Sequence, residues 1–243
     1  SLASGGSICF PDRPPNKATR GARPPGTARD PRTRRARRPA PGPVRALAAG
    51  GVPHEGVLHA ALDYIDARKD CADFVIQGLL RLMVWERQDP RLSPEINALM
   101  KDTVLGFKYW VDEPGDTVMY MGSENHRLLF HVAEWMAGQL FPTEEFTNSR
   151  MRGLYHATKG RMYITEWLRQ RGRFGFDEWH SNSYYPICIA PLINVYDFAI
   201  YEDYKLQQMA GAVLDYMFFN LAADSLHGVL GTTHGRSYGI NIK

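Results

Sequence analysis

The sequence predicts an all-α fold built from antiparallel helical hairpins. Between residues 54 and 223, apolar side chains recur at spacings of three and four, which is the period of one helix face. Short polar loops separate about seven such stretches, and helices joined by short loops pack as antiparallel neighbours. We find no stretch with the alternating pattern of a β-strand. No motif repeats at a fixed period from one hairpin to the next.

The first three predicted helices cover residues 55–69, 70–87 and 93–107. We expect Asp70 to cap the second helix, because an aspartate before an apolar-periodic segment accepts hydrogen bonds from the free amides of the first turn. Ser93 is expected to cap the third helix in the same way. The proline that follows this serine suits the first turn of a helix.

Four further helices are predicted at residues 126–141, 147–171, 184–202 and 204–223. The last of them has a broad apolar stripe of methionine, phenylalanine and leucine, which is typical of a helix packed in a core. We expect Asp224 to cap the end of this helix.

Residues 1–50 form a segment of a different kind, rich in Pro, Arg, Gly and Ala. They include ten Arg, one Lys and two Asp, whereas the rest of the chain is mildly acidic. With almost no large apolar side chains after Phe10, this segment cannot bury enough surface to offset the entropy of ordering, so we expect a disordered tail. Its cluster RTRRARR, residues 32–38, suits a polyanion. Because no aromatic residue is interleaved with the arginines, nucleic acid is not an expected partner.

The remaining residues, 51–243, are expected to form one catalytic domain that is cut short at its C-terminus. No run approaches the roughly 18–20 uninterrupted apolar residues that span a bilayer, and no signal peptide is visible, so the localisation stays open. The three cysteines have no paired spacing and the histidines no HExxH pattern, so we expect neither a metal nor another cofactor. His131 and His156 lie inside helices and are assigned to core packing.

The candidate functional residues gather in loops beside helix ends. Residues 122–126, GSENH, place an acid, an amide and an imidazole directly before an apolar helix, where free amides and a partial positive charge are available. Residues 175–186, GFDEWHSNSYYP, repeat this arrangement, and residues 231–239, GTTHGRSYG, add a third polar loop. Capping by Ser123 or Asn125 alone would account for the first loop, but three such loops indicate a shared site.

Asn125 and His126 at a helix start, followed by Tyr184 or Tyr185 at the entrance of a later helix, resemble the Asn/His and Tyr pattern of alginate lyases and heparinase II/III-like enzymes. Those families are polysaccharide lyases with an α/α toroid. The resemblance covers residues 100–239. It implies that the predicted hairpins form part of such a toroid, and that the chain cleaves a uronic-acid-containing polysaccharide by β-elimination.

The resemblance also implies roles for individual residues. Asn125 and His126 would hold the uronate carboxylate, which must be neutralised before the proton at C5 can leave. His126 or His180 would act as the base, and Tyr184 or Tyr185 as the acid that protonates the leaving O4 oxygen, with both choices open. Substrate-binding residues are expected from the same loops and their aromatic flanks: Trp110, Tyr120, Trp179, Asn182, His234 and Arg236.

Two other functions stay open. A glycoside hydrolase on the same toroid would need two carboxyl groups, one as acid and one as base or nucleophile, and Glu124 and Glu178 are the expected pair. A non-catalytic helical carbohydrate-binding scaffold would instead have polar loops that face different directions. The expected partner is a polysaccharide or oligosaccharide in each case.

Overall fold

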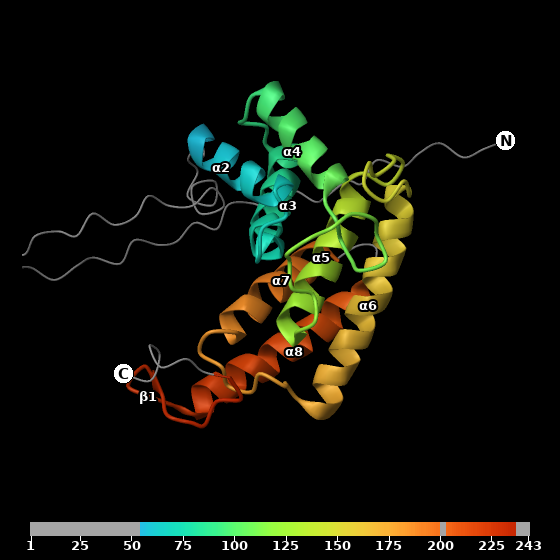
Figure 1. Cartoon of the computed structure of the whole chain (residues 1–243). Coiled ribbons are helices and arrows are strands. Elements are labelled where there is room, and N and C mark those ends of the chain that lie inside the picture. Colours follow the sequence, from blue (N-terminus) through green and yellow to red (C-terminus); the bar gives the residue numbers. More distant parts are fainter. Residues whose placement is uncertain (1–53, 200–202, 237–243) are drawn as a thin grey trace, which may run out of the picture. The chain divides into compact units, whose positions relative to one another are not determined.

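The computed structural model describes residues 54–199 and 203–236 (Figure 1). The described chain is mostly helical, which confirms the all-α fold class. Its helices are α2 (Glu55–Asp66), α3 (Ala72–Gln88), α4 (Pro94–Gly106), α5 (Glu124–Leu140), α6 (Gly153–Phe174), α7 (Tyr185–Phe198) and α8 (Tyr204–Ala223). The predicted tail, residues 1–50, and the first residues of the predicted domain lie outside the described residues.

A small antiparallel hairpin follows α8, although the sequence predicted no strand. It consists of β1 (Ser225–Leu226) and β2 (Val229–Leu230). Strands of two residues are too short to show an alternating pattern, which is why the sequence did not reveal them. The turn between them is formed by His227 and Gly228, which both have positive φ angles, 52° and 80°, as tight hairpin turns often require. Asp224 is the C-cap of α8, as expected.

The predicted cap Ser93 is present, Ser123 is the cap where the sequence left Ser123 or Asn125 open, and the predicted cap Asp70 is wrong. Ser93 and Ser123 cap α4 and α5, and each hydroxyl oxygen accepts a hydrogen bond from the N–H three residues further on. The N-cap of α3 is Cys71 instead of Asp70; it has a left-handed φ of 65° and no side-chain cap bond. The carboxylate of Asp70 accepts a long hydrogen bond from the N–H of Tyr120, at 3.4 Å. Asp70 therefore contacts a distant loop instead of its own helix.

Helix α6 begins at Gly153, later than the predicted start at residue 147. The intervening residues form a tight loop, in which the Phe146 N–H donates to the carbonyl of Met151 at 2.9 Å. Arg150 in this loop has a φ of 61°, which a helix cannot accommodate. Helix α5 starts two residues earlier than predicted, and α7 ends at residue 198 instead of 202.

Helices α5 and α6 pack side by side at backbone contact (Figure 1). A Cβ atom on Gly138 would lie 2.3 Å from the backbone nitrogen of Ala157, and one on Gly160 would lie 2.7 Å from the carbonyl oxygen of His131. Helices α3 and α7 also pack against α5, so almost all of its side chains are buried. Polar side chains on α5 must therefore find partners within the protein.

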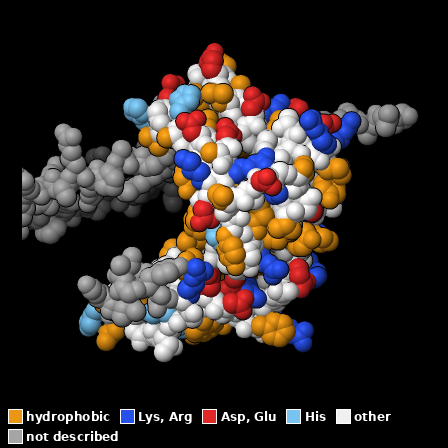
Figure 2. Space-filling model, in the orientation of Figure 1, with side chains coloured by type: hydrophobic (Ala, Val, Ile, Leu, Met, Phe, Trp, Pro, Cys, Tyr) orange, Lys and Arg blue, Asp and Glu red, His pale blue; other side chains and the backbone are white. Residues whose placement is uncertain are grey.

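The face of the molecule in Figure 2 carries acidic and basic side chains interspersed with apolar ones. A mixed surface of this kind provides little long-range attraction for a polyanion, so any selectivity for one has to come from a local site. Among the described residues, no helix is long and apolar enough to cross a membrane.

Candidate functional site

The start of α5 brings an acid and an amide into the protein interior. Ser123 caps the helix, and the next two side chains, Glu124 and Asn125, are both buried, the amide completely. Burying such groups costs free energy unless they are paired. The polar residues at the start of α5 therefore do more than cap it, and the partners of Glu124 and Asn125 come from α6 and from the second polar loop.

Glu124 joins three segments of the chain. One carboxylate oxygen forms an ion pair with Arg171 of α6, and the other accepts a hydrogen bond from the backbone N–H of Glu178 at 2.9 Å. Its carbonyl oxygen accepts a hydrogen bond from the indole N–H of Trp167 at 3.0 Å. Both carboxylate oxygens are thus used by the protein, and Glu124 attaches the 175–184 loop to α5 and α6.

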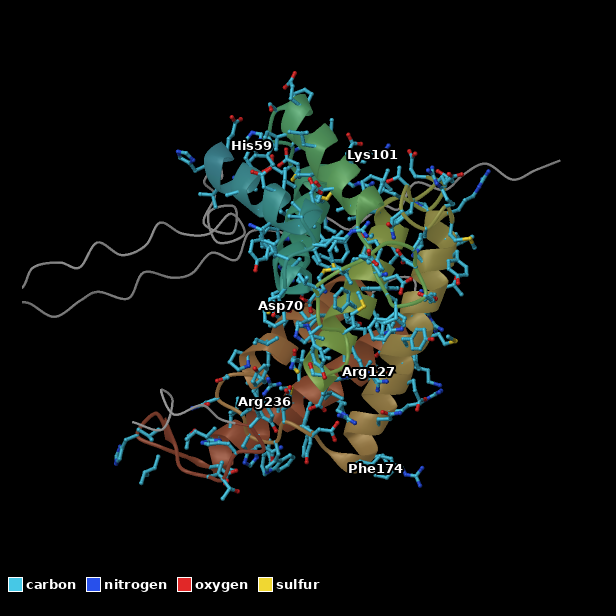
Figure 3. The ribbon with its side chains drawn as sticks, in the orientation of Figure 1. His59, Asp70, Lys101, Arg127, Phe174 and Arg236 are labelled. Carbon is cyan, nitrogen blue, oxygen red and sulfur yellow. The ribbon has the colours of Figure 1, made fainter. Side chains whose placement is uncertain are left out.

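The carboxylate of Glu178 is held by one residue from each of the other two loops. Oε2 accepts a hydrogen bond from Nδ2 of Asn125 at 2.7 Å, and Oε1 accepts one from Nη1 of Arg236 at 2.8 Å. The side chain of Arg236, labelled in Figure 3, is 42% exposed, whereas that of Glu178 is 9% exposed. The three polar loops therefore meet at one buried carboxylate with a guanidinium at the surface above it.

Backbone contacts hold the third loop against the second. The N–H of Gly235 donates to the carbonyl of Trp179 at 2.7 Å, and the hydroxyl of Ser181 donates to the carbonyl of Arg236 at 2.6 Å. A Cβ atom on Gly235 would lie 2.8 Å from the carbonyl oxygen of Asp177, so only glycine fits this close approach. These bonds fix the backbone of Arg236 and so limit where its guanidinium can lie.

His180 and His234 lie at the same junction. Nδ1–H of His234 donates to the carbonyl of His180 at 2.5 Å. The ring of His180 stacks on Trp179 with centroids 4.2 Å apart, and its Nδ1 lies 3.3 Å from the Thr232 hydroxyl and 3.4 Å from a carboxylate oxygen of Asp224. Within the described part of the chain its buried Nε2 has no hydrogen-bond partner, and burial lowers the pKa of the ring. A neutral imidazole of this kind has the protonation state of a general base.

The two adjacent tyrosines have different environments. Tyr185 is 1% exposed and packs between Phe176 and His180, with ring centroids 5.2 and 6.0 Å away. Burial of its hydroxyl raises the pKa of Tyr185 to about 12. Tyr184 is partly exposed, and the guanidinium carbon of Arg236 lies 4.2 Å from its ring centroid. Of these two phenols, only that of Tyr184 lies partly at the surface beside a cation.

The imidazole of His126 contacts α3 and the loop before α5. Its Nδ1 lies 2.6 Å from Oδ2 of Asp73, which is fully buried. The ring stacks on Phe74 at 5.1 Å, with the edge of Tyr120 5.8 Å away. Burial raises the pKa of Asp73, although the hydrogen bond from His126 lowers it in part. Tyr120 itself is 59% exposed.

The remaining predicted substrate-binding residues are spread over different surroundings. Trp110 packs on His131, with ring centroids 4.3 Å apart, whereas Trp179 packs on His180 and on Tyr216 of α8. Asn182 is exposed in the second polar loop. The two tryptophans thus contact separate clusters, so they do not stack on the two sides of one sugar ring.

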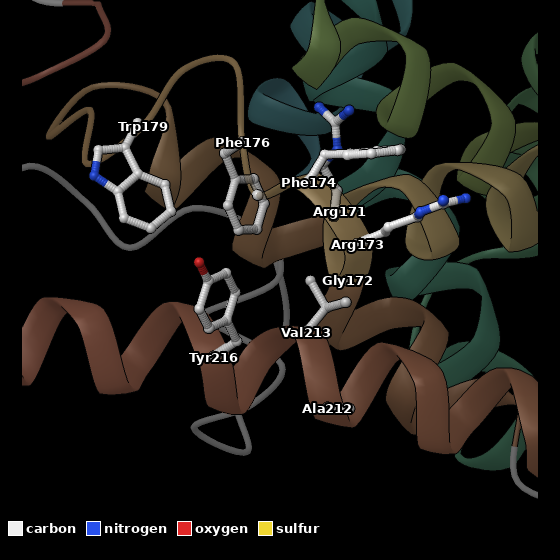
Figure 4. Close-up of a pocket in the computed structure, with 10 residues that line it drawn as sticks. Arg171, Gly172, Arg173, Phe174, Phe176, Trp179, Ala212, Val213 and Tyr216 are labelled. Atoms are coloured by element: carbon white, nitrogen blue, oxygen red, sulfur yellow. The ribbon is translucent and has the colours of Figure 1, made fainter.

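An open pocket of about 750 Å³ adjoins the second polar loop. Figure 4 shows it between the end of α6, the loop that follows and α8. Its lining includes the aromatic rings of Phe176, Trp179 and Tyr216 and the side chains of Arg171 and Arg173. Arg171 and Trp179 belong both to this pocket and to the network around Glu124 and Glu178. The pocket therefore offers aromatic surface and positive charge next to the polar site.

A second buried polar cluster lies between α5 and α6, and the sequence reasoning missed it. Glu134 of α5 accepts hydrogen bonds from Nδ1 of His131 at 3.3 Å and from Nδ1 of His156 at 3.0 Å. The ammonium of Lys159 lies 3.2 Å from the same carboxylate. Each histidine alone looked like a core residue. The signal that could have found them is the spacing of two polar pairs, His131 with Glu134 and His156 with Lys159. The residues of each pair are three positions apart on a helix face that is otherwise apolar.

This cluster keeps an ionised carboxylate in the interior. Burial alone would raise the pKa of Glu134, but hydrogen bonds from His131 and His156 and the charge of Lys159 outweigh it and lower the pKa to about 2. Burial lowers the pKa of His131. Burial alone would also lower the pKa of Lys159, but the carboxylates of Asp112 and Glu134 raise it.

Comparisons of this chain with protein-family models, with curated proteins and with solved structures find no significant match. Its function has to be inferred from the geometry of its own residues.

Proposed function

We propose that this chain belongs to a polysaccharide lyase that cleaves a uronic-acid-containing polysaccharide by β-elimination, with its helical hairpins forming part of an α/α toroid. The observation that supports this most directly is the position of Arg236 above the ring of Tyr184, 4.2 Å from its centroid. This pair places a carboxylate-binding cation beside a partly exposed phenol. Those are two groups that the reaction requires in one place.

In the proposed reaction, Arg236 binds the uronate carboxylate and reduces its negative charge. This makes the proton at C5 easier to remove, because the developing carbanion is next to that carboxylate. A base takes the C5 proton, the bond between C4 and O4 breaks, a double bond forms between C4 and C5, and an acid protonates the leaving O4 oxygen.

Tyr184 is the proposed acid, because its neighbour Tyr185 is buried and holds its proton more tightly. The proposed base is His180 or His234. His180 is favoured by its lowered pKa and by an Nε2 atom without a partner. Because His180 is buried, the loop of residues 175–184 has to open before a sugar can reach its imidazole. The role of His180 as base depends on that movement.

Asn125 and His126 have supporting roles in this proposal. The amide of Asn125 is fully buried on Glu178, and the imidazole of His126 faces Asp73. Neither is therefore placed to bind the uronate directly. Glu178 acts as a positioning residue, because its carboxylate orients Arg236 through a 2.8 Å hydrogen bond.

Aromatic residues beside the site suit a chain of sugars. The pocket lined by Phe176, Trp179 and Tyr216 presents ring faces on which sugar rings stack, and Arg173 adds positive charge for an acidic unit. The polysaccharide would then extend from the Arg236 and Tyr184 pair into this pocket.

A glycoside hydrolase is the second candidate, because one observation favours it. The backbone N–H of Glu178 donates to the carboxylate of Glu124, so the two carboxyl groups expected for a hydrolase belong to one network. However, each is already paired with an arginine. A hydrolase needs one carboxyl group that keeps a proton to donate, and pairing with arginine favours the charged form. The scaffold function is less favoured. A scaffold is expected to have polar loops that face different directions, whereas the three loops here meet at Glu178.

The test is a search for new conjugated absorbance in mixtures of the protein with uronate-containing polysaccharides, with reducing ends measured in parallel. We expect both signals from the wild type, and loss of both in Tyr184→Phe, by roughly a hundredfold or more for a lost acid. Tyr185→Phe is the matched control, and it should keep both signals because the Tyr185 side chain is buried and does not reach the surface where a sugar would bind.

Reducing ends without conjugated absorbance would reject elimination and favour hydrolysis by Glu124 and Glu178. In that case Glu178→Gln should abolish the activity and Tyr184→Phe should not. Equal activity of the two tyrosine variants would contradict the role assigned to Tyr184. Neither signal with any polysaccharide would favour the scaffold.

A further inference from the structure

The second polar cluster has the arrangement of a metal site, and the proposed lyase reaction does not use it. We propose that Glu113, Glu134 and His156 bind a divalent transition-metal ion. Among the described residues, each of these side chains offers one ligand atom, and all three atoms lie within 4.8 Å of one another. The three residues come from the loop before α5, from α5 and from α6, and none is more than 7% exposed.

The distances between the ligand atoms suit a small cation. Nδ1 of His156 lies 3.0 Å from Oε1 of Glu134 and 3.9 Å from Oε1 of Glu113. Atoms about 2.0–2.1 Å from one zinc ion in tetrahedral geometry are roughly 3.4 Å apart. The two observed distances lie on either side of this value, so small side-chain movements would bring the ligands to an ion.

The other polar atom of each ligand already has a protein partner. The partners are Asn148 for Glu113 at 2.8 Å, His131 for Glu134 at 3.3 Å and Ser149 for His156 at 2.7 Å. Such outer contacts orient the ligands of metal sites and set the histidine tautomer. With a metal on Nδ1 of His156, its Nε2–H donates to the hydroxyl oxygen of Ser149. The outer contacts thus leave Oε1 of both glutamates and Nδ1 of the histidine directed inward.

Glu113 provides an independent observation that points to a ligand. Among the residues that the structure describes, its buried Oε1 atom has no hydrogen-bond partner, and the residue is only 7% exposed. A buried carboxylate oxygen without a partner costs free energy. A bound cation would remove this cost.

The donor set favours a first-row transition metal over magnesium or calcium. Two carboxylate oxygens and one imidazole nitrogen suit Zn²⁺ or a similar ion, whereas Mg²⁺ and Ca²⁺ prefer oxygen ligands alone. The close packing of α5 against α6 through Gly138 and Gly160 holds two of the ligands in place. Because the site is buried, the ion would act as a structural clamp between the 107–123 loop and the two helices.

Lys159 is the competitor for this site. Its ammonium lies 3.2 Å from Oε1 of Glu134 and 2.7 Å from Oδ1 of Asp112, so it offsets the negative charge that a metal would otherwise neutralise. Lys159 and Asp112 also line an open pocket of about 290 Å³, which provides a route from the surface. An entering ion has to displace the ammonium from Glu134, while the ammonium keeps its contact with the more exposed Asp112.

The experiment is a calorimetric titration of the metal-free, untagged full chain with Zn²⁺, together with thermal unfolding, and with Mg²⁺ for comparison. We expect one Zn²⁺ per chain, a higher Tm with Zn²⁺, and little effect of Mg²⁺. Glu113→Gln should weaken binding at least about tenfold, since even the loss of an outer contact costs that much. Lys159→Met should strengthen binding, because it removes the competing charge.

Glu144→Gln is the matched control, because Glu144 pairs with Lys101 at the surface, and binding should be unchanged. Absence of Zn²⁺ binding by the wild type would overturn the proposal, and so would binding that Glu113→Gln leaves unchanged. Binding that appears only in Lys159→Met would also overturn it for the natural chain, since the lysine would then fill the site permanently. None of these results depends on lyase activity.

Discussion

At the scale of single residues, the interior of this protein contains acidic side chains that are each paired with a basic side chain. Asp73 depends on His126, Glu124 on Arg171, and Glu178 on Arg236. Removing one partner from a buried pair costs more than removing both, because the group that remains is neither hydrated nor paired. Substitutions in these pairs therefore change stability as well as chemistry, and their effects have to be separated by controls.

The pH dependence of stability should change when Asp73 is replaced by asparagine. Burial raises the pKa of Asp73 in the folded state above its ordinary value of 3.8. The contribution of Asp73 to stability is therefore full below about pH 4 and is lost as the pH rises through the raised pKa. Urea unfolding should be measured for both proteins at a series of pH values. As the pH increases, the free energy of unfolding of Asp73→Asn should rise relative to that of the wild type. A constant difference would contradict this account of Asp73.

At the scale of elements, the contact between α5 and α6 positions both polar clusters. Glu124 at the start of α5 pairs with Arg171 near the end of α6, and Glu134 in the middle of α5 meets His156 and Lys159 of α6. These pairs form because glycines at the contact let the two backbones approach closely. The separation of the two helices therefore determines the geometry of both clusters.

Gly138→Ala should destabilise the protein strongly. The added Cβ would lie 2.3 Å from the nitrogen of Ala157 and 2.4 Å from the carbonyl oxygen of Gly153, both backbone atoms that cannot turn away. We expect a loss in the free energy of unfolding at or above the upper end of the roughly 1–3 kcal/mol typical of overpacking. Chemical denaturation measures this loss.

Gly172→Ala on α6 is the control for that substitution, because no atom lies within 4 Å of its added Cβ. Here we expect a gain of about 0.5–1 kcal/mol, since alanine is favoured over glycine inside a helix. Equal effects of the two substitutions would show that the helices do not pack at backbone contact.

At the scale of the molecule, the segment after β2 completes the first polar site from a distant part of the sequence. It is held by hydrogen bonds from Gly235 to Trp179, from Ser181 to Arg236 and from His234 to His180. Its described residues, 231–236, are exposed or half-buried, so the segment should open more easily than the helical core.

Gly235→Ala should release this segment while leaving the core intact. The added Cβ would lie 2.8 Å from the carbonyl oxygen of Asp177 and from the nitrogen of Trp179. Hydrogen exchange of residues 177–181 and 232–236 should become at least about tenfold faster, which corresponds to a loss of about 1.4 kcal/mol in local stability. Exchange in α5 and α6 should not change.

Gly231→Ala provides the comparison, because its nearest new contact is an ordinary 3.8 Å. Under the proposed function, Gly235→Ala should also lower lyase activity, since Arg236 would lose its position above Tyr184. Unchanged exchange in Gly235→Ala would mean that the segment is not held by the close approach seen here.

The sequence by itself determined the helical class, the approximate helix positions and the cap Ser93, and it limited the cap of α5 to Ser123 or Asn125. It also indicated the three polar loops. These features depend on residue spacing and on neighbours within one turn, so local pattern is sufficient to predict them. The sequence did not predict that Asp70 accepts a hydrogen bond from the N–H of Tyr120, because this bond depends on where the loop of Tyr120 lies in the folded protein.

Only the tertiary structure decided which polar groups meet. It separated the partly exposed ring of Tyr184 from the buried ring of Tyr185, paired Glu178 with Arg236, and gathered Glu113, Glu134 and His156 into one buried cluster. Each of these outcomes joins residues that are adjacent only after packing, and the free energy of a buried charge depends on partners that the local sequence does not contain.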